Sequence, residues 1–194
     1  MMPTPMLFRY SLNDPMGELR QIQFNHPARH LDEVSNQLPG GVYTTFRTYH
    51  KSFALNLDDH IQRLEHSAAE IIGKISIDRD IFRRNLRSVL KQHPAAESRI
   101  RVTLVQEDVA GVQIYLAIEE LILPNPGLYK SGVSVITTPL MRTKPDVKDT
   151  EFIKQTKSLR RLLTNGINEV LMVNQKGEVL EGLSSNFLPY REVR

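Results

Sequence analysis

Two segments in the first half of the chain carry apolar side chains at helical spacing. The first begins near Asp58, which can cap a helix, and its apolar residues fall on one face of that helix. These residues are Ile61, Leu64, Ala68, Ile71 and Ile72. The second runs from Asp78 to Gln92 and ends before Pro94, because a proline disfavours helical geometry in the residue that precedes it.

Shorter segments alternate between apolar and polar positions, as strands do. They are 42–49, 52–55, 99–106, 112–118, 132–138 and 169–174, and a turn and a short strand ending at Glu181 follow the last of them. The order hairpin, helices, hairpin predicts an α+β layer in which helices cover one face of an antiparallel sheet. We expect a further helix over 150–164, with Asn165-Gly166 ending it.

A proline-rich linker, Pro124-Asn-Pro-Gly127, separates these strands and helices into two groups. It predicts an N-terminal domain over 1–125 and a C-terminal domain over 126–194. The 194 residues suffice for a substantial core, with 40% hydrophobic and 24% charged residues.

The composition excludes several functions. There is no cysteine, which rules out disulfides and thiolate chemistry and suits a cytoplasmic protein. No apolar run is long enough for a membrane span. The net charge is +3 with scattered basic residues, so we expect no nucleic-acid binding. His26 and His30 have helical spacing, but Pro27 interrupts that turn, and we expect no metal site.

Three motifs, in order, carry the candidate chemistry. The first is Gly40-Gly-Val-Tyr-Thr-Thr-Phe-Arg-Thr-Tyr49, and the second, His60-Ile-Gln-Arg-Leu64, continues to Ser67-Ala68. The third starts with Lys148 and ends with Glu181-Gly-Leu-Ser-Ser-Asn-Phe187. Together they resemble the fold-type IV pyridoxal-phosphate enzymes, the class IV aminotransferases. This family includes branched-chain and D-amino-acid aminotransferases and aminodeoxychorismate lyases.

The resemblance implies pyridoxal 5′-phosphate as the cofactor and gives each matched residue a role. Lys148 would be the catalytic lysine that binds the cofactor as an aldimine. Arg63 would hold the phosphate, because a guanidinium can make a bidentate bond to it. Glu181 would keep the pyridine nitrogen protonated, and Ser185 and Asn186 would line the cofactor.

Other interpretations of these residues stay open. Tyr43 matches a substrate-facing aromatic of the family, and a strand aromatic buried in the core is an equal alternative. Arg63 could instead be an exposed helical arginine paired with Asp59, and His60 is expected to satisfy a local backbone group. Three other lysines compete with Lys148 for the catalytic role: Lys144, Lys154 and Lys157.

The implied fold is a small N-terminal two-layer α/β-sandwich domain followed by an incomplete C-terminal cofactor domain. Family members continue well beyond the Ser-Asn-Phe segment, so we expect a C-terminally truncated chain. The implied function is transfer of an amino group from an amino acid to a 2-oxo acid, in a homodimer when complete. Thr44 stands where many aminotransferases have glutamate, and this favours an aminodeoxychorismate lyase as the alternative. A non-catalytic remnant is the third interpretation.

Overall fold

A computed structural model describes residues 4–142, 147–164 and 166–189, and the chain divides into two compact units. Unit 1 comprises Met1–Ile122 with Asp146–Ile153, and unit 2 comprises Leu123–Pro145 with Lys154–Arg194. The short segment that carries Lys148 therefore belongs to the same unit as the N-terminal residues. A single domain boundary near residue 125 would separate the two. The domain boundaries themselves stay a prediction.

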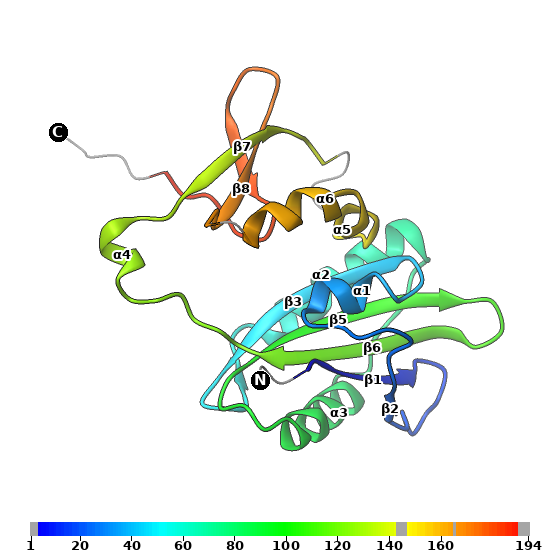
Figure 1. Cartoon of the computed structure of the whole chain (residues 1–194). Coiled ribbons are helices and arrows are strands. Elements are labelled where there is room, and N and C mark those ends of the chain that lie inside the picture. Colours follow the sequence, from blue (N-terminus) through cyan, green and yellow to red (C-terminus); the bar gives the residue numbers. More distant parts are fainter. Residues whose placement is uncertain (1–3, 143–146, 165, 190–194) are drawn as a thin grey trace. The chain divides into compact units, whose positions relative to one another are not determined.

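Unit 1 contains a six-stranded antiparallel sheet. Its strands are β1 (Met6–Ser11), β2 (Arg20–Ile22), β3 (Gly41–Tyr49), β4 (Phe53–Ala54), β5 (Ser98–Glu107) and β6 (Gly111–Glu120). They follow the order β2-β1-β6-β5-β3-β4, with the β5–β6 hairpin at the centre (Figure 1). Both predicted hairpins are confirmed, whereas β1 and β2 lie in the proline-interrupted start of the chain, where the pattern predicted no strand.

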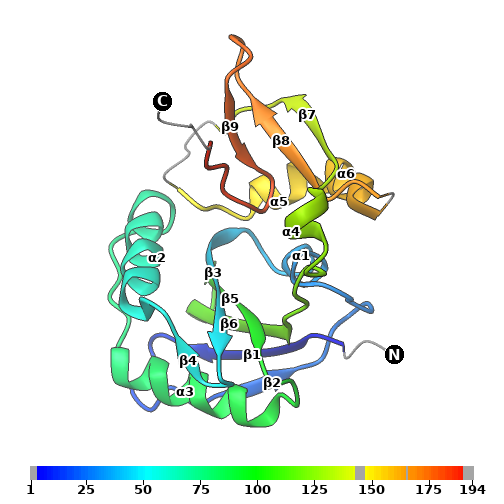
Figure 2. The same cartoon turned by 90° about the vertical axis from the view of Figure 1, so that its left-hand side faces the viewer.

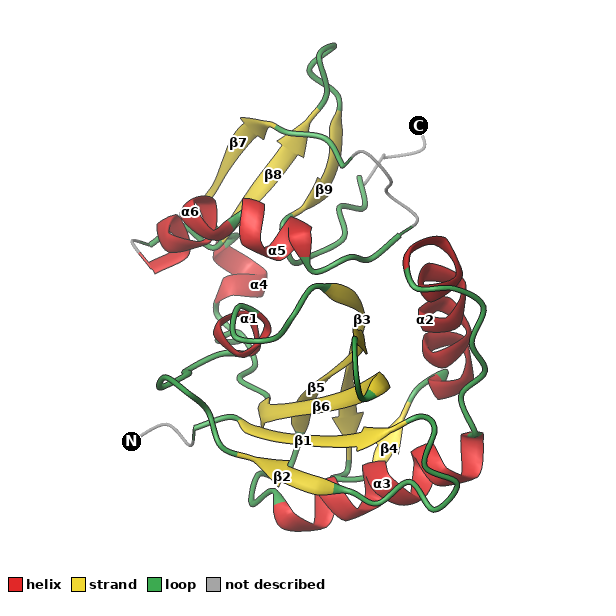
Figure 3. Ribbon diagram, turned by 90° about the vertical axis from the view of Figure 1, so that its right-hand side faces the viewer, coloured by secondary structure: helices red, strands yellow, loops and turns green. Residues whose placement is uncertain are grey.

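One face of this sheet forms the main core with two helices. Ile100, Val102 and Leu104 of β5 point to this face and are fully buried. Against them pack α2 (Leu57–Ile71) and α3 (Arg79–Gln92), which lie on the same side of the sheet (Figure 3). The predicted α+β arrangement, with helices over an antiparallel sheet, is confirmed.

The opposite face of the sheet carries a smaller core. A short helix, α1 (Leu31–Ser35), places Leu31 and Val34 in this cluster, together with Tyr115 and Ala117 of β6. The sequence predicted helices on one face only. The difference arises because α1 is too short for a periodic apolar pattern to reveal it.

The starts of the two long helices differ in how they are capped. Asp78 caps α3, since its carboxylate accepts hydrogen bonds from the backbone N–H groups of Asp80 and Ile81. The predicted Asp58 cap of α2 is wrong. Asn56 is the cap residue, with a left-handed φ of 51° and no side-chain cap bond, and Asp58 lies in the first helical turn.

Unit 2 contains a three-stranded sheet with the order β7-β8-β9 (Figure 2). Strands β7 (Val135–Pro139) and β8 (Glu169–Val173) are parallel, and β9 (Val179–Gly182) is antiparallel to β8. Parallel neighbours require a crossover connection, and here it contains short helices. The predicted strands and closing hairpin are confirmed. Val170 and Met172 of β8 are buried.

The helix predicted over 150–164 is broken. It consists of α5 (Glu151–Gln155), α6 (Lys157–Arg160) and a 3₁₀ turn (Arg161–Thr164), and a separate short helix, α4 (Leu128–Ser131), precedes β7. The fully buried Thr156 separates α5 from α6. Asn165, predicted to end this helix, lies outside the described residues. No helix in the described ranges is long and apolar enough to span a bilayer.

The cap of α3 gives a stability test. Replacing Asp78 with alanine removes two hydrogen bonds to the first turn, each 2.9 Å long. We expect a loss of about 1 kcal/mol in the free energy of unfolding, measured by urea denaturation.

Asn56→Gly is the matched change at α2, where no side-chain cap bond exists and φ is positive. It should leave stability unchanged or raise it. Equal losses in the two variants would contradict this assignment of the caps.

Candidate active site

A backbone clamp holds the Lys148 segment on the edge of β3. The N–H of Tyr43 donates to the carbonyl of Lys148 at 2.8 Å, and the N–H of Thr150 donates to the carbonyl of Gly41 at 2.8 Å. The N–H of Gly41 also donates to the Thr150 hydroxyl at 2.9 Å. A longer contact of 3.5 Å joins the Lys148 N–H to the buried Ser67 hydroxyl of α2. The position of Lys148 is therefore fixed by both β3 and α2.

Glycine is required at position 41 of this clamp. A Cβ atom there would lie 2.0 Å from the backbone carbonyl oxygen of Leu104 on β5. Any side chain would push β3 away from β5, and the clamped segment would move with it. The Gly40-Gly41 pair of the first motif thus supports the geometry around Lys148.

His60 connects α2 to the same end of β3. Its Nδ1 and the hydroxyl of the buried Thr44 share a hydrogen bond of 3.0 Å. Burial lowers the pKa of His60 below its ordinary value of 6.5, and the positive charges of Arg63 and Lys148 lower it further, against an opposing effect of Asp59. His60 is therefore neutral at pH 7, and both cations lie within its electrostatic reach.

These contacts correct the expected partner of His60, and Arg63 has the exposed position of its alternative interpretation. His60 was expected to satisfy a backbone group, whereas its partner is the Thr44 side chain, which a strand–helix contact places beside it. Arg63 is exposed, and the alternative pairing with Asp59 does not form within the described ranges. The Arg63 guanidinium is consequently available to an anion from solution.

Tyr43 is buried on the other face of β3, because successive strand residues alternate between faces. The guanidinium carbon of Arg101 lies 4.9 Å from the centre of its ring, a cation–π geometry. Arg101 is held by Asp32 and Ser35, each at 2.8 Å, and by the Thr45 hydroxyl at 3.1 Å. This network fixes the ring of Tyr43 and was not evident from the sequence, since its members lie on three separate elements.

In unit 2, Glu181 lies half-buried on β9 and forms an ion pair with Arg142. The Arg142 Nε and a Glu181 carboxylate oxygen are 3.0 Å apart, and the Arg142 side chain is only 8% exposed. This contact holds the Glu181 carboxylate in place on β9. Arg142 gave no sequence signal, because it precedes the third motif and belongs to no periodic segment.

The loop after β9 turns around a buried carboxylate. Glu169 accepts hydrogen bonds from the Ser184 hydroxyl at 3.1 Å and from the Ser184 N–H at 3.4 Å. The N–H of Gly182 donates to the Ser185 carbonyl at 2.8 Å. A Cβ on Gly182 would lie 2.8 Å from the Glu169 carboxyl carbon, so a side chain there would displace the Glu169 side chain. Ser185 and Asn186 are exposed on this loop.

The predicted site residues thus form two groups. Tyr43, Arg63 and Lys148 belong to unit 1, and Glu181 and the loop residues 185–186 belong to unit 2. Two of the competing lysines are exposed residues of unit 2, Lys154 and Lys157. The third, Lys144, lies outside the described residues.

These donors fit the chemistry of pyridoxal phosphate. In unit 1, an exposed guanidinium and a half-buried amine are groups that suit a phosphate and an aldehyde, and unit 2 by itself offers the Glu181 carboxylate. This division of roles follows the chemistry of the side chains.

The comparisons with known proteins identify the family and the fold. The family model for aminotransferase class IV matches residues 41–192, so the chain belongs to the class IV aminotransferase family. The predicted family and fold class are confirmed, and membership supports the predicted cofactor, pyridoxal 5′-phosphate. No curated protein matches the sequence.

Several solved structures share the fold. One is a Thermotoga maritima protein provisionally described as a branched-chain amino acid aminotransferase, with 23% identity and a TM-score of 0.61 over 91% of this chain and 60% of that one. A pyridoxal-phosphate-bound hypothetical aminotransferase from Mycobacterium tuberculosis has 22% identity and a TM-score of 0.61, covering 91% and 65%.

A protein provisionally described as a 4-amino-4-deoxychorismate lyase has 27% identity and a TM-score of 0.57, covering 74% of this chain and 57% of that one. The chain therefore spans less than two thirds of the length of these three structures.

The charges around His60 can be tested by NMR titration of its imidazole. We expect a pKa below 6.5 that rises in Arg63→Ala and, by less, in Lys148→Ala, because each removes a neighbouring positive charge. Since the unfolded pKa is the higher one, the contribution of His60 to stability is complete above pH 6.5 and decreases as pH falls below it.

Lys154→Ala, which removes an exposed lysine of unit 2, serves as the control and should leave this pKa unchanged. If the pKa of His60 were the same in Lys148→Ala as in the unchanged protein, the Lys148 amine would not lie near His60.

The Glu169 carboxylate gives a second test of the site. Glu169→Gln keeps the shape but replaces one acceptor oxygen with a donor amide, so part of its bonding to Ser184 and to the Val170 N–H is lost. We expect a loss of about 1–3 kcal/mol in the free energy of unfolding by urea denaturation.

Glu178→Gln changes an exposed carboxylate of the β8–β9 hairpin that bonds Asn174. This control should cost less than about 1 kcal/mol. If Glu169→Gln and Glu178→Gln lowered the free energy of unfolding equally, Glu169 would not organise the loop.

Proposed function

We propose that this protein is a pyridoxal-phosphate-dependent aminotransferase with Lys148 as its catalytic lysine. It transfers an amino group from an amino acid to a 2-oxo acid. The observation that carries the proposal is the clamp of Lys148 to β3 beside His60 and Arg63. An amine for the cofactor aldehyde and a guanidinium for its phosphate thereby share one neighbourhood.

Each residue has a separate task in this reaction. Pyridoxal phosphate, when bound, draws electrons from the carbon that loses a proton. Lys148 would hold the cofactor through its aldehyde carbon. Once the substrate amine has displaced the lysine from that carbon, its free Nζ would accept the substrate α-proton and return it to the cofactor side. Arg63 would bind the phosphate, and Glu181 would accept a hydrogen bond from the protonated pyridine nitrogen. We assign Ser185 and Asn186 to hydrogen bonds around the cofactor.

Tyr43 is proposed to contact the substrate. The Arg101 network restrains its ring, so any contact that Tyr43 makes is preorganised rather than adjustable. The proposed substrates are small amino acids and 2-oxo acids, and the proposed assembly is a homodimer. His60 has a positioning role, because its bond to Thr44 connects α2, which carries Arg63, to β3.

An aminodeoxychorismate lyase is the second candidate function. The hydroxyl of Thr44 stands where many aminotransferases carry glutamate, and it is used by His60. A protein provisionally described as such a lyase also has 27% identity to this chain. The lyase would release pyruvate, whereas the aminotransferase would convert the amino donor to its 2-oxo acid, and the two products distinguish the functions.

Cofactor attachment can be mapped directly. Incubation with pyridoxal phosphate and reduction with borohydride should fix the cofactor on Lys148, detected as a mass increase on the peptide that contains it. Lys148→Ala should abolish this adduct, because among residues 4–142, 147–164 and 166–189 Lys148 is the lysine whose backbone is clamped to β3. Lys154→Ala and Lys157→Ala are matched controls and should retain it.

An adduct on Lys154 or Lys157 would refute the lysine assignment while leaving the family unaffected. A protein that forms no adduct on any lysine would instead fit a non-catalytic remnant.

A further inference from the structure

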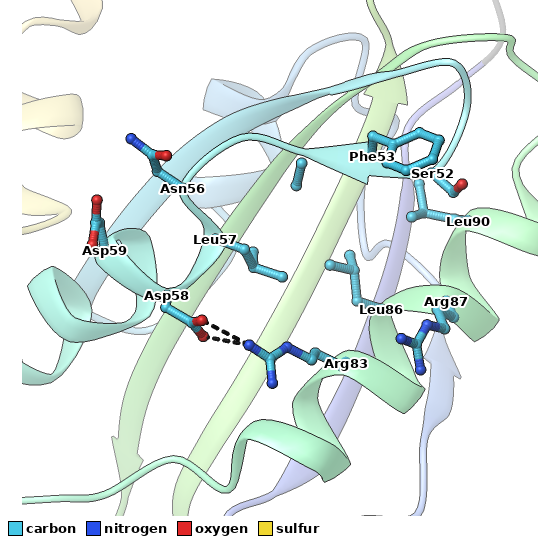
Figure 4. A pocket seen from close by; sticks show the side chains of 11 residues that line it. Ser52, Phe53, Asn56, Leu57, Asp58, Asp59, Arg83, Leu86, Arg87 and Leu90 are labelled. Carbon is cyan, nitrogen blue, oxygen red and sulfur yellow. Dashed lines mark hydrogen bonds and ion pairs between the residues drawn. The ribbon is translucent and has the colours of Figure 1, made fainter.

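A cavity of about 540 Å³ lies in unit 1. Its walls come from the β4 hairpin, the first turn of α2 and the exposed side of α3 (Figure 4). None of its lining residues is among those proposed to hold the cofactor or the substrate. The volume lies within the range of about 300–1,000 Å³ that is typical of small-molecule sites.

Its centre and one end are apolar. Leu86 and Leu90 of α3 form part of the wall and are almost fully buried from solvent. Phe53 of β4 lies on the same side as Leu90, and 68% of its surface is exposed (Figure 4). An exposed aromatic beside buried leucines offers a surface that an apolar ligand can cover.

The two arginines of the cavity differ in their partners. The Arg83 guanidinium contacts both carboxylate oxygens of Asp58 at 2.7 Å, so its charge is compensated. Arg87 follows one turn later on α3 and is exposed. Within residues 4–142, 147–164 and 166–189 it makes no hydrogen bond or ion pair. It is the cation of this cavity that can bind an external anion.

A second carboxylate of the lining, that of Asp59, lies at the opposite end of the cavity from Arg87. Asp59 belongs to the first turn of α2, and Figure 4 shows it across the cavity from Arg87, with Leu57 and Leu86 between them. A second negative charge on a ligand would meet Asp59 and be repelled. The arrangement therefore favours one anionic end, at Arg87, and an uncharged apolar remainder.

We propose that this cavity is a second ligand site, which binds an amphipathic monocarboxylate. The carboxylate pairs with Arg87 beside Leu90, and the apolar body extends along Leu86 and Leu57 toward Asp59. This site shares no residue with the proposed aminotransferase site.

The test uses the full chain and three probes of equal length: octanoate, octylamine and suberate. Methyl NMR titrations should show octanoate shifting the signals of Leu86 and Leu90. Suberate, with its second carboxylate near Asp59, and octylamine, without any carboxylate, should bind at least about tenfold more weakly.

Arg87→Gln should weaken octanoate binding about tenfold or more, because the charge-assisted bond is lost. Lys91→Gln removes another exposed charge from the end of α3, outside the cavity lining, and should change nothing. Asp59→Asn should improve suberate binding selectively. The proposal is refuted if octylamine binds as well as octanoate, or if Arg87→Gln retains full octanoate affinity.

Discussion

The candidate site depends on the antiparallel contact between the segment around Lys148 and the start of β3. About one hundred residues separate the two partners, so closing this loop has a large entropic cost that a few hydrogen bonds alone do not offset. Burial of the apolar sheet residues provides the rest of the stabilisation that offsets this cost. Because Gly41 lies against the Leu104 carbonyl with no room for a side chain, β3 approaches β5 closely and presents its outer edge to Lys148.

Charge around Lys148 follows from the same placement. His60 bonds Thr44, and its burial lowers the pKa of the imidazole below the ordinary value, an effect to which the charges of Arg63 and Lys148 add. A neutral imidazole adds no further positive charge beside Lys148 and Arg63. The amine of Lys148 and the exposed guanidinium of Arg63 thus lie in one neighbourhood. Together they suit an anionic cofactor that also carries an aldehyde.

Unit 2 shows how one buried carboxylate can organise a loop. Glu169 begins β8 and bonds to Ser184, and the absence of a side chain at Gly182 lets the loop close over it. Glu181 lies immediately before this glycine, and Arg142 holds its carboxylate. The Glu-Gly pair of the third motif therefore places a carboxylate beside a residue whose lack of a side chain leaves room for the loop.

The sequence by itself determined the elements whose signals are local. The Asp78-capped helix, the β5–β6 hairpin and the β8–β9 hairpin follow from apolar periodicity and turn residues in adjacent segments. The three motifs also determined the family. Tertiary structure alone decided the place of β1 in the sheet, the break at Thr156, the Thr44 partner of His60 and the Arg142 partner of Glu181. Each of these depends on contacts between residues far apart in the chain, and no local pattern encodes which distant side chain will fill a space that only the folded sheet creates.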